Sequence, residues 1–183
     1  IVVREIDALG GQMAISADHT CLQIKMLNLS KGPAVRAIRV QSDKVAYSKY
    51  MQNVCMSQEN LDIYEGLVDE IIVENETIKG IILEDGTIVY SKKVIITTGT
   101  YLSSRVLCGM NTTPTGPDGE KTNYGLSKSL KNHGFKLLRL KTGTPPRIWT
   151  NSIDFSNMQL ELGTELPLTF SYTTDPKTMI PFD

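Results

Sequence analysis

Apolar residues in the first third of the chain recur mostly at helical spacing. Residues 1–9 and 12–18 fit two short helices separated by Gly10-Gly11, and the pattern over Cys21–Leu27 fits a strand. Pro33 then opens a predicted helix that runs to about Ser57. One face of that helix would carry apolar residues, namely Ala37, Val40, Tyr47, Met51 and Val54.

Two arginines take defined places in this predicted helix. At about 100° per residue, Arg36 falls on the side of Tyr47 and is expected to face a partner surface or cleft. Arg39 and Asp43 are spaced i, i+4, so we expect them to form an ion pair.

From Asp62 onward the pattern changes to β-structure. Turn signals at Asn75-Glu76 and Asp85-Gly86 separate apolar-rich segments and predict a three-stranded β-meander. Its segments are Asp62–Gly66 with Val68–Val73, then Ile78–Leu83, then Thr87–Tyr90. The continuous apolar run Lys93–Thr98, which ends at Gly99, is typical of a buried parallel strand.

The rest of the chain alternates turn-rich loops with one helix and one strand. Residues 109–122 are dense in turn formers and predict an exposed loop. A helix is predicted from residue 123 or 124 to about 133, capped by Gly134. Phe135–Leu140 then predicts a strand, and Lys141–Arg147 predicts a stiff loop.

Composition excludes several classes of protein. The chain is 40% hydrophobic and 21% charged, which suits one ordinary core, and no apolar run approaches the roughly 20 residues of a membrane helix. The cysteines form no Cys-x-x-Cys pair, so we expect them to be small core residues in a reducing, cytoplasmic compartment. The histidines lack a ligand pattern, so no metal site is expected. Because the chain starts with Ile1 inside a helical pattern, we expect a piece of a longer protein.

Charge is distributed unevenly although the net charge is only −1. Between Met56 and Tyr90, nine acids stand against Lys79 alone, whereas between Lys121 and Trp149 seven bases occur without an acid. The net charge argues against a uniformly basic nucleic-acid binder, but this asymmetry can create a local basic surface. The alternative is a solvated helix face followed by a loop.

Residues 30–37, Ser-Lys-Gly-Pro-Ala-Val-Arg-Ala, combine features that suit an anionic ligand. Gly32 lets a ligand approach the backbone, Pro33 suits a first helical turn, and a helix start offers free N–H groups. Lys31, Arg36 and Arg39 add positive charge. The alternative is a loop-to-helix junction with solvated basic residues.

The predicted order of elements is that of the central part of flavoproteins with two dinucleotide-binding domains. A strand that ends at Thr98-Gly99 would place a ligand at the carboxyl edge of an open α/β sheet. Several segments together resemble the glucose-inhibited division protein A (MnmG) family, over nearly the whole chain but more weakly after about Ser156. These segments are Asp7–Gly11, Leu27-Asn28 with Ser30–Ala37, Thr98–Thr100, and Arg139–Arg147 followed by Ile153–Phe155.

This resemblance implies a fold and a domain order. We expect an α/β chain that forms part of an FAD-binding, Rossmann-like domain of the glutathione-reductase type with a three-stranded β-meander. Residues 1–150 would be the central part of that domain, and residues 151–183 the start of an inserted second domain.

The resemblance also implies an activity. Family members, with a GTPase partner of the MnmE type, add a (carboxymethyl)aminomethyl group to C5 of the wobble uridine in tRNA. The expected cofactors are FAD, NADH and methylenetetrahydrofolate, and a homodimer is expected. The family's FAD contacts fall on Val68 and on Asn123, where the family has a serine and the amide can still donate and accept.

Further candidates come from residue chemistry. Additional residues expected to line the FAD site are Lys31, Gly32, Pro33, Thr98 and Gly99. Basic residues can neutralise tRNA phosphates or stack on a splayed base. The candidates for tRNA contact are Arg36, Arg39, Arg139, Lys141 and Arg147. For Arg139 the alternative is an ion pair with the acidic meander.

The Gly-x-Gly-x-x-Gly unit that cradles the FAD pyrophosphate in the family does not occur in this sequence. The cysteines do not match those implicated in the family's chemistry, so we assign no catalytic residue and expect this segment alone to be inactive. Two other functions stay open: an FAD-dependent oxidoreductase acting on a small molecule, and a non-catalytic RNA-binding module.

Overall fold

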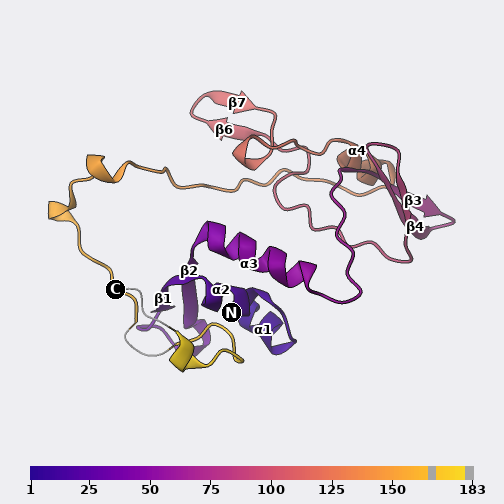
Figure 1. Cartoon of the computed structure of the whole chain (residues 1–183). Coiled ribbons are helices and arrows are strands. Elements are labelled where there is room, and N and C mark those ends of the chain that lie inside the picture. Colours follow the sequence, from indigo (N-terminus) through magenta and orange to yellow (C-terminus); the bar gives the residue numbers. More distant parts are fainter. Residues whose placement is uncertain (165–167, 180–183) are drawn as a thin grey trace. The chain divides into compact units, whose positions relative to one another are not determined.

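The computed structural model describes residues 1–164 and 168–179. The chain divides into two compact units (Figure 1). The first unit comprises residues 1–63 and 147–183, and the second comprises residues 64–146. The division of the intact protein into domains near residue 150 stays a prediction, and residues 165–167 and 180–183 of the expected second domain lie outside the described residues.

The first unit begins with the two predicted short helices, α1 (Val2–Ala8) and α2 (Met13–His19). Between them Gly10 adopts a φ of +88°, a left-handed conformation that favours glycine. The predicted strand is confirmed as β1 (Cys21–Leu27), and it pairs antiparallel with β2 (Ala37–Ser42).

The helix predicted from Pro33 to about Ser57 is wrong in its first part. Pro33–Val35 form one 3-10 turn (η1), and β2 follows it. Ile38 and Val40 are half-buried whereas Arg39 and Gln41 are exposed, which is the two-residue period of a strand. The apolar residues assigned to one long helical face therefore belong to two elements.

The helix proper, α3, spans Lys44–Met56 and starts at an aspartate cap. The carboxylate of Asp43 accepts the backbone N–H groups of Val45 at 2.9 Å and Ala46 at 2.8 Å. The predicted ion pair between Asp43 and Arg39 is therefore wrong, since Arg39 lies in β2 and donates to Gln23 Oε1 at 3.4 Å.

Two buried carboxylates hold a late segment of the chain in the first unit. Asp18 accepts the backbone N–H groups of Phe170 at 2.7 Å and Ser171 at 2.8 Å, and Asp7 accepts that of Tyr172 at 2.8 Å. Asp7 and Asp18 are only 7% and 6% exposed. These side chains thus satisfy backbone donors that would otherwise be buried without partners.

Three short 3-10 turns lie in the late part of the first unit. They are η3 (Thr150–Ser152), η4 (Phe155–Asn157) and η5 (Pro176–Thr178).

In the second unit, the predicted β-meander is confirmed. Strands β3 (Val68–Glu74), β4 (Thr77–Leu83) and β5 (Ile88–Tyr90) form an antiparallel sheet in the order β3-β4-β5. Helix α4 (Gly125–Asn132) packs against β3 (Figure 1).

The core of the second unit lies between α4 and the sheet. Ile71, Leu126 and Leu130 are buried there, and each such side chain contributes about 1.5–3 kcal/mol on burial. Half-buried apolar residues surround this cluster, namely Val68, Val73, Ile78, Ile81, Leu102 and Leu137. The first turn of α4 approaches β3 closely, because a Cβ at Gly125 would overlap the carboxylate of Asp69.

Several predicted β-segments do not form strands. Lys93–Thr98 and Phe135–Leu140 belong to no sheet, and Asp62–Gly66 is irregular. A strand needs a hydrogen-bonding neighbour, and within residues 1–164 and 168–179 none is placed beside these segments.

The turn-rich segment 109–122 is largely exposed, as predicted, but it is not entirely loop. β6 (Val106–Cys108) and β7 (Asn111–Thr113) form a small hairpin, and Pro117–Gly119 form a 3-10 turn (η2). The prediction that all cysteines are core residues is wrong for Cys108, which is exposed in this hairpin.

Two negative findings concern the described residues only. They contain no group of three or more His, Cys, Asp or Glu side chains that could hold a metal ion. They also contain no helix that is long and apolar enough to cross a membrane.

Candidate functional site

Four residues predicted to bind FAD line one pocket of the second unit. Val68, Thr98, Gly99 and Asn123 border a cavity of about 370 Å³. The other lining residues are Gly66, Leu67, Thr97, Tyr101, Lys121 and Leu126. This volume is within the range of small-molecule sites, about 300–1,000 Å³.

A second cavity of about 250 Å³ shares part of this lining, including Val68, Thr97 and Thr98. Its remaining walls are apolar residues of β3, β4, α4 and the segment 94–96. The segment predicted as a buried strand borders this cavity without entering the sheet. Its predicted burial is wrong, since Ile95 is 88% and Ile96 41% exposed. Thr97 and Thr98, at its carboxyl end, line both cavities.

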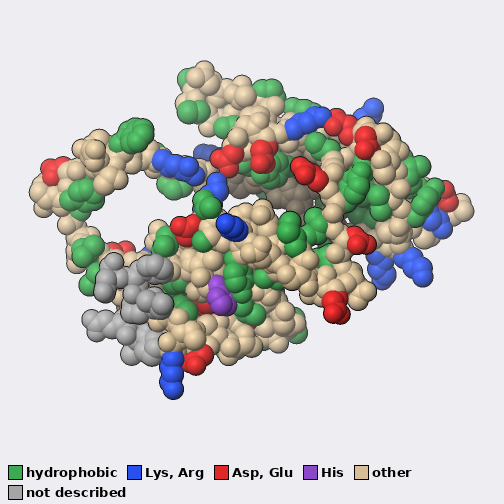
Figure 2. Space-filling model, viewed as in Figure 1, with side chains coloured by type: hydrophobic (Ala, Val, Ile, Leu, Met, Phe, Trp, Pro, Cys, Tyr) green, Lys and Arg blue, Asp and Glu red, His purple; other side chains and the backbone are tan. Residues whose placement is uncertain are grey.

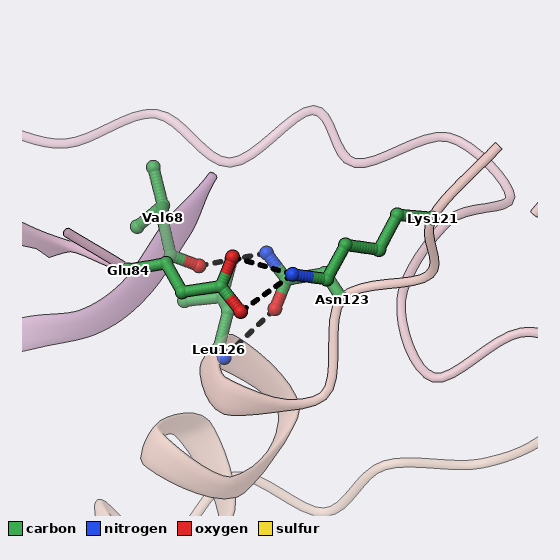
Figure 3. A network of polar contacts seen from close by, with 5 residues as sticks. All are labelled: Val68, Glu84, Lys121, Asn123 and Leu126. Atoms are coloured by element: carbon green, nitrogen blue, oxygen red, sulfur yellow. Dashed lines mark hydrogen bonds and ion pairs between the residues drawn. The ribbon is translucent and has the colours of Figure 1, made fainter. Parts of the chain in front are cut away.

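Asn123 joins the elements that surround the pocket. Its side-chain Nδ2 donates to the backbone oxygen of Val68 at 2.7 Å, and its Oδ1 accepts the N–H of Leu126 at 3.0 Å (Figure 3). Its backbone N–H also donates to Tyr101 O at 2.9 Å, and its backbone oxygen accepts the N–H of Ser103 at 2.8 Å. The two residues that the resemblance assigns to FAD thus contact each other, and the Asn123 amide keeps one N–H and one lone pair for another partner.

The segment Thr97–Gly99 forms another wall of the pocket. Gly99 has a φ of +52°, and the chain turns there, with Tyr101 N–H donating to Thr98 O at 3.1 Å. Glycine at such a turn leaves backbone accessible to a ligand, and the role of Thr98-Gly99 in FAD binding stays a prediction.

Lys121 lies at this pocket and was not among the sequence candidates. Its Nζ donates to Glu84 Oε1 at 2.6 Å and Oε2 at 2.5 Å (Figure 3). A single lysine in a turn-rich segment gives no sequence signal of this contact, because Glu84 is distant in sequence. Leu67 and Thr97 were also missed, although each adjoins a predicted residue in sequence, and so were Gly66, Tyr101 and Leu126.

Acidic groups adjoin the pocket residue Tyr101. A side-chain hydrogen bond to Glu120, desolvation, and the negative charges of Glu120 and Asp118 raise the pKa of Tyr101. The tyrosine is therefore a neutral hydrogen-bonding group at physiological pH.

The other predicted FAD residues, Lys31, Gly32 and Pro33, lie in the first unit. They belong to an exposed loop in which Asn28 Nδ2 donates to Val35 O at 2.9 Å and Arg36 donates to Leu29 O at 3.3 Å. Gly32 has an ordinary φ of −61°, and a Cβ there would meet nothing within 4 Å. The fold of this unit thus does not itself require glycine at position 32.

The candidate tRNA-binding residues are all exposed and are divided between the units. Arg36 is not on a helix face, because it follows η1 in extended conformation, so that expectation is wrong. Arg139 donates to the backbone oxygen of Ser103 at 3.1 Å. Lys141 and Arg147 lie in an irregular segment. Lys and Arg side chains also occur at several places on the surface seen in Figure 2.

Comparisons with known proteins give the chain a family. The model of the family described as "Glucose inhibited division protein A" matches residues 1–181. The tRNA uridine 5-carboxymethylaminomethyl modification enzyme MnmG of Acholeplasma laidlawii is 57% identical over 172 residues, covering 94% of this chain and 28% of that protein. The enzyme of the same name from Mycoplasma mycoides subsp. mycoides is 54% identical over 181 residues, covering 98% of this chain and 29% of that protein.

A solved structure agrees with the sequence relatives. The GidA structure from Aquifex aeolicus, form I crystal, matches with a TM-score of 0.89 and 44% identity, over 96% of this chain and 29% of that one. This match confirms the prediction of a partial Rossmann-like α/β fold. The chain spans less than a third of the length of each of these relatives. With its sequence matched almost from end to end, the chain belongs to the glucose-inhibited division protein A family.

Proposed function

We propose that this chain is part of an FAD-dependent enzyme that modifies the wobble uridine of tRNA. The observation that carries the proposal is the family match over residues 1–181, together with relatives named for modification of tRNA uridine. The intact enzyme would add a (carboxymethyl)aminomethyl group to C5 of that base.

The pocket of the second unit is the proposed place for part of the FAD. Val68, Thr98, Gly99 and Asn123 would contact the cofactor there, and the cavity's apolar walls and exposed backbone suit a planar ring. Lys31, Gly32 and Pro33 are proposed as further contacts; an unobstructed glycine without a fold requirement supports a close approach at that loop. When bound, FAD supplies hydride and electron transfer.

The remaining components of the reaction are proposed on family grounds. NADH would reduce the flavin, methylenetetrahydrofolate would supply the one-carbon unit, and a GTPase of the MnmE type would act as partner of a homodimer. Arg36, Arg39, Arg139, Lys141 and Arg147 are the proposed tRNA contacts, supported by their exposure. A cytoplasmic location stays a prediction from the sequence.

Filling the pocket tests the FAD assignment in the intact protein. Thr97→Trp places a large ring in the pocket from an exposed position, so it should weaken FAD binding at least tenfold. Thr112→Trp, in exposed β7 and outside the pocket lining, is the matched control and should bind FAD normally. Titration of the flavin-free protein, followed by flavin fluorescence, measures both. Equal FAD affinity in the two variants would remove the FAD assignment of this pocket.

The segment of 183 residues by itself is expected to bind FAD weakly and to be inactive, because no Gly-x-Gly-x-x-Gly unit occurs in it. Stoichiometric flavin absorbance in the purified segment would contradict that expectation.

Of the alternative functions, a small-molecule oxidoreductase predicts flavin turnover that is independent of tRNA. A non-catalytic RNA-binding module predicts no flavin in the intact protein.

A further inference from the structure

A charge pair at the pocket has no role in the family-based proposal. Lys121 is the only charged residue among the described residues that line the pocket. Both oxygens of Glu84 hold its ammonium group, at 2.6 Å and 2.5 Å (Figure 3). The backbone N–H of Glu84 in turn donates to the oxygen of Leu67, a lining residue, at 2.8 Å.

Lys121 can exchange the carboxylate of Glu84 for another anion. The side chains of Lys121 and Glu84 are 62% and 53% exposed, and solvent-exposed ion pairs contribute little to stability. A phosphate oxygen offers the ammonium group the same kind of charge-assisted hydrogen bond that the carboxylate does. Replacing one acceptor by the other breaks no covalent bond and leaves the lysine charged.

The rest of the lining offers an anion no other charged partner. It consists of glycine backbone, apolar side chains, threonine hydroxyls, one tyrosine and the Asn123 amide. A neutral ring could bind there without Lys121, whereas a ligand phosphate near the pocket could gain a charge-assisted contact from Lys121 in addition to its other contacts.

We propose that Lys121 is a specificity-determining residue that selects phosphate-bearing ligands in this pocket, and that Glu84 competes with the phosphate for the same ammonium group. The ligand class is a nucleotide or flavin whose ring enters the pocket and whose phosphate reaches Lys121. This inference rests on the proposed function, in which the pocket holds part of FAD.

The test compares ligands that differ in phosphate, on flavin-free intact protein. The probes are FAD itself and the pairs ADP with adenosine and FMN with riboflavin. In Lys121→Gln, the affinity for FAD should fall by about two- to fivefold, and so should the affinity for ADP or FMN, whichever binds. The affinity for the matching neutral ligand, adenosine or riboflavin, should not change. Glu84→Gln should tighten the same phosphate-bearing ligands by a similar factor.

Two controls separate this role from a structural one. Lys136→Gln removes an exposed base that does not line the pocket and should leave all affinities unchanged. In the double variant, Glu84→Gln should have no effect once Lys121 is replaced, since the two residues act on one ammonium group. High salt should reduce the differences, because the exposed charges are screened.

The outcomes distinguish this inference from the FAD assignment. Weaker binding of phosphate-bearing and neutral ligands alike in Lys121→Gln would overturn the inference, as would unchanged ADP, FMN and FAD affinity in Glu84→Gln. If Thr97→Trp weakens FAD binding while the Lys121 and Glu84 variants change nothing, only the inference fails. If Thr97→Trp also leaves FAD affinity unchanged, the FAD assignment of the pocket fails with it.

Discussion

At the residue scale, Asn123 shows how one side chain can shape a site that it also borders. Its amide satisfies the carbonyl of Val68 at the start of β3 and the N–H of Leu126 in the first turn of α4. A serine hydroxyl, which the family resemblance leads us to expect here, is shorter and offers one donor instead of two. The longer asparagine amide instead contacts both the strand and the helix.

Removing this amide should destabilise the second unit. Asn123→Ala leaves a half-buried carbonyl and N–H without partners, which costs about 1–3 kcal/mol. Asn123→Ser should recover part of that loss, while Asn111→Ala, at an exposed position of β7, should change little. Chemical denaturation of the intact protein measures all three. Equal stability of Asn123→Ala and the parent would show that the two hydrogen bonds of the Asn123 amide contribute nothing to stability.

At the element scale, strand β1 holds a later part of the chain at its edge. Thr164 N–H donates to Ile24 O at 2.9 Å, Gln23 Nε2 donates to Glu161 O at 3.0 Å, and Lys25 forms an ion pair with Glu161. The hydrogen bond from Lys25, its positive charge, and that of Arg39 lower the pKa of Glu161. The stabilising contribution of the Lys25–Glu161 ion pair is therefore present above the ordinary glutamate pKa. It is lost as pH falls through the lowered pKa of Glu161.

Acidification should loosen this attachment before the unit unfolds. Protonation of Glu161 removes the ion pair, so amide exchange at Thr164, corrected for intrinsic rates, should speed up as pH falls below the ordinary glutamate range of about 4.3. Glu161→Gln should exchange faster already at neutral pH, and Glu59→Gln, at an exposed position, is the control. Protection of Thr164 that is the same in all three proteins at neutral pH would contradict this account.

Elements defined by neighbours in sequence were predictable, and those defined by distant partners were not. The meander and α4 follow from turn signals and apolar spacing that lie inside them. In contrast, β2 forms because Ile38 and Val40 pair along β1, a partner that helical spacing does not reveal. Lys93–Thr98 has the composition of a buried strand, but composition supplies no hydrogen-bonding neighbour. For the pocket, the family resemblance indicated Val68 and Asn123, and the Thr-Gly end of an apolar run indicated Thr98 and Gly99. The Lys121–Glu84 contact, in contrast, depends on folding.

At the scale of the whole molecule, the candidate residues fall in two units. The loop with Lys31 and Arg36 belongs to the first, the pocket to the second, and Arg147 to the first again. The FAD candidates and the tRNA candidates each have members in both units, so the two kinds of binding are tested by substitutions of single residues.

Arg36→Ala and Arg147→Ala should weaken tRNA binding in the intact protein and leave most of the flavin bound. Each lost phosphate contact should also reduce the slope of log affinity against log salt by about one. Filter binding over a salt series, with flavin absorbance measured in parallel, tests this. Unchanged tRNA affinity in both variants would remove these arginines from the tRNA-binding surface.

The proposed FAD site is the pocket of the second unit, which would hold part of the cofactor. The most direct test is hydrogen–deuterium exchange of the intact protein with and without FAD. We expect FAD addition to slow exchange in residues 66–68 and 97–99, which line the pocket, and to leave exchange in the β6–β7 hairpin unchanged. Equal exchange in the pocket segments with and without bound FAD would contradict this expectation.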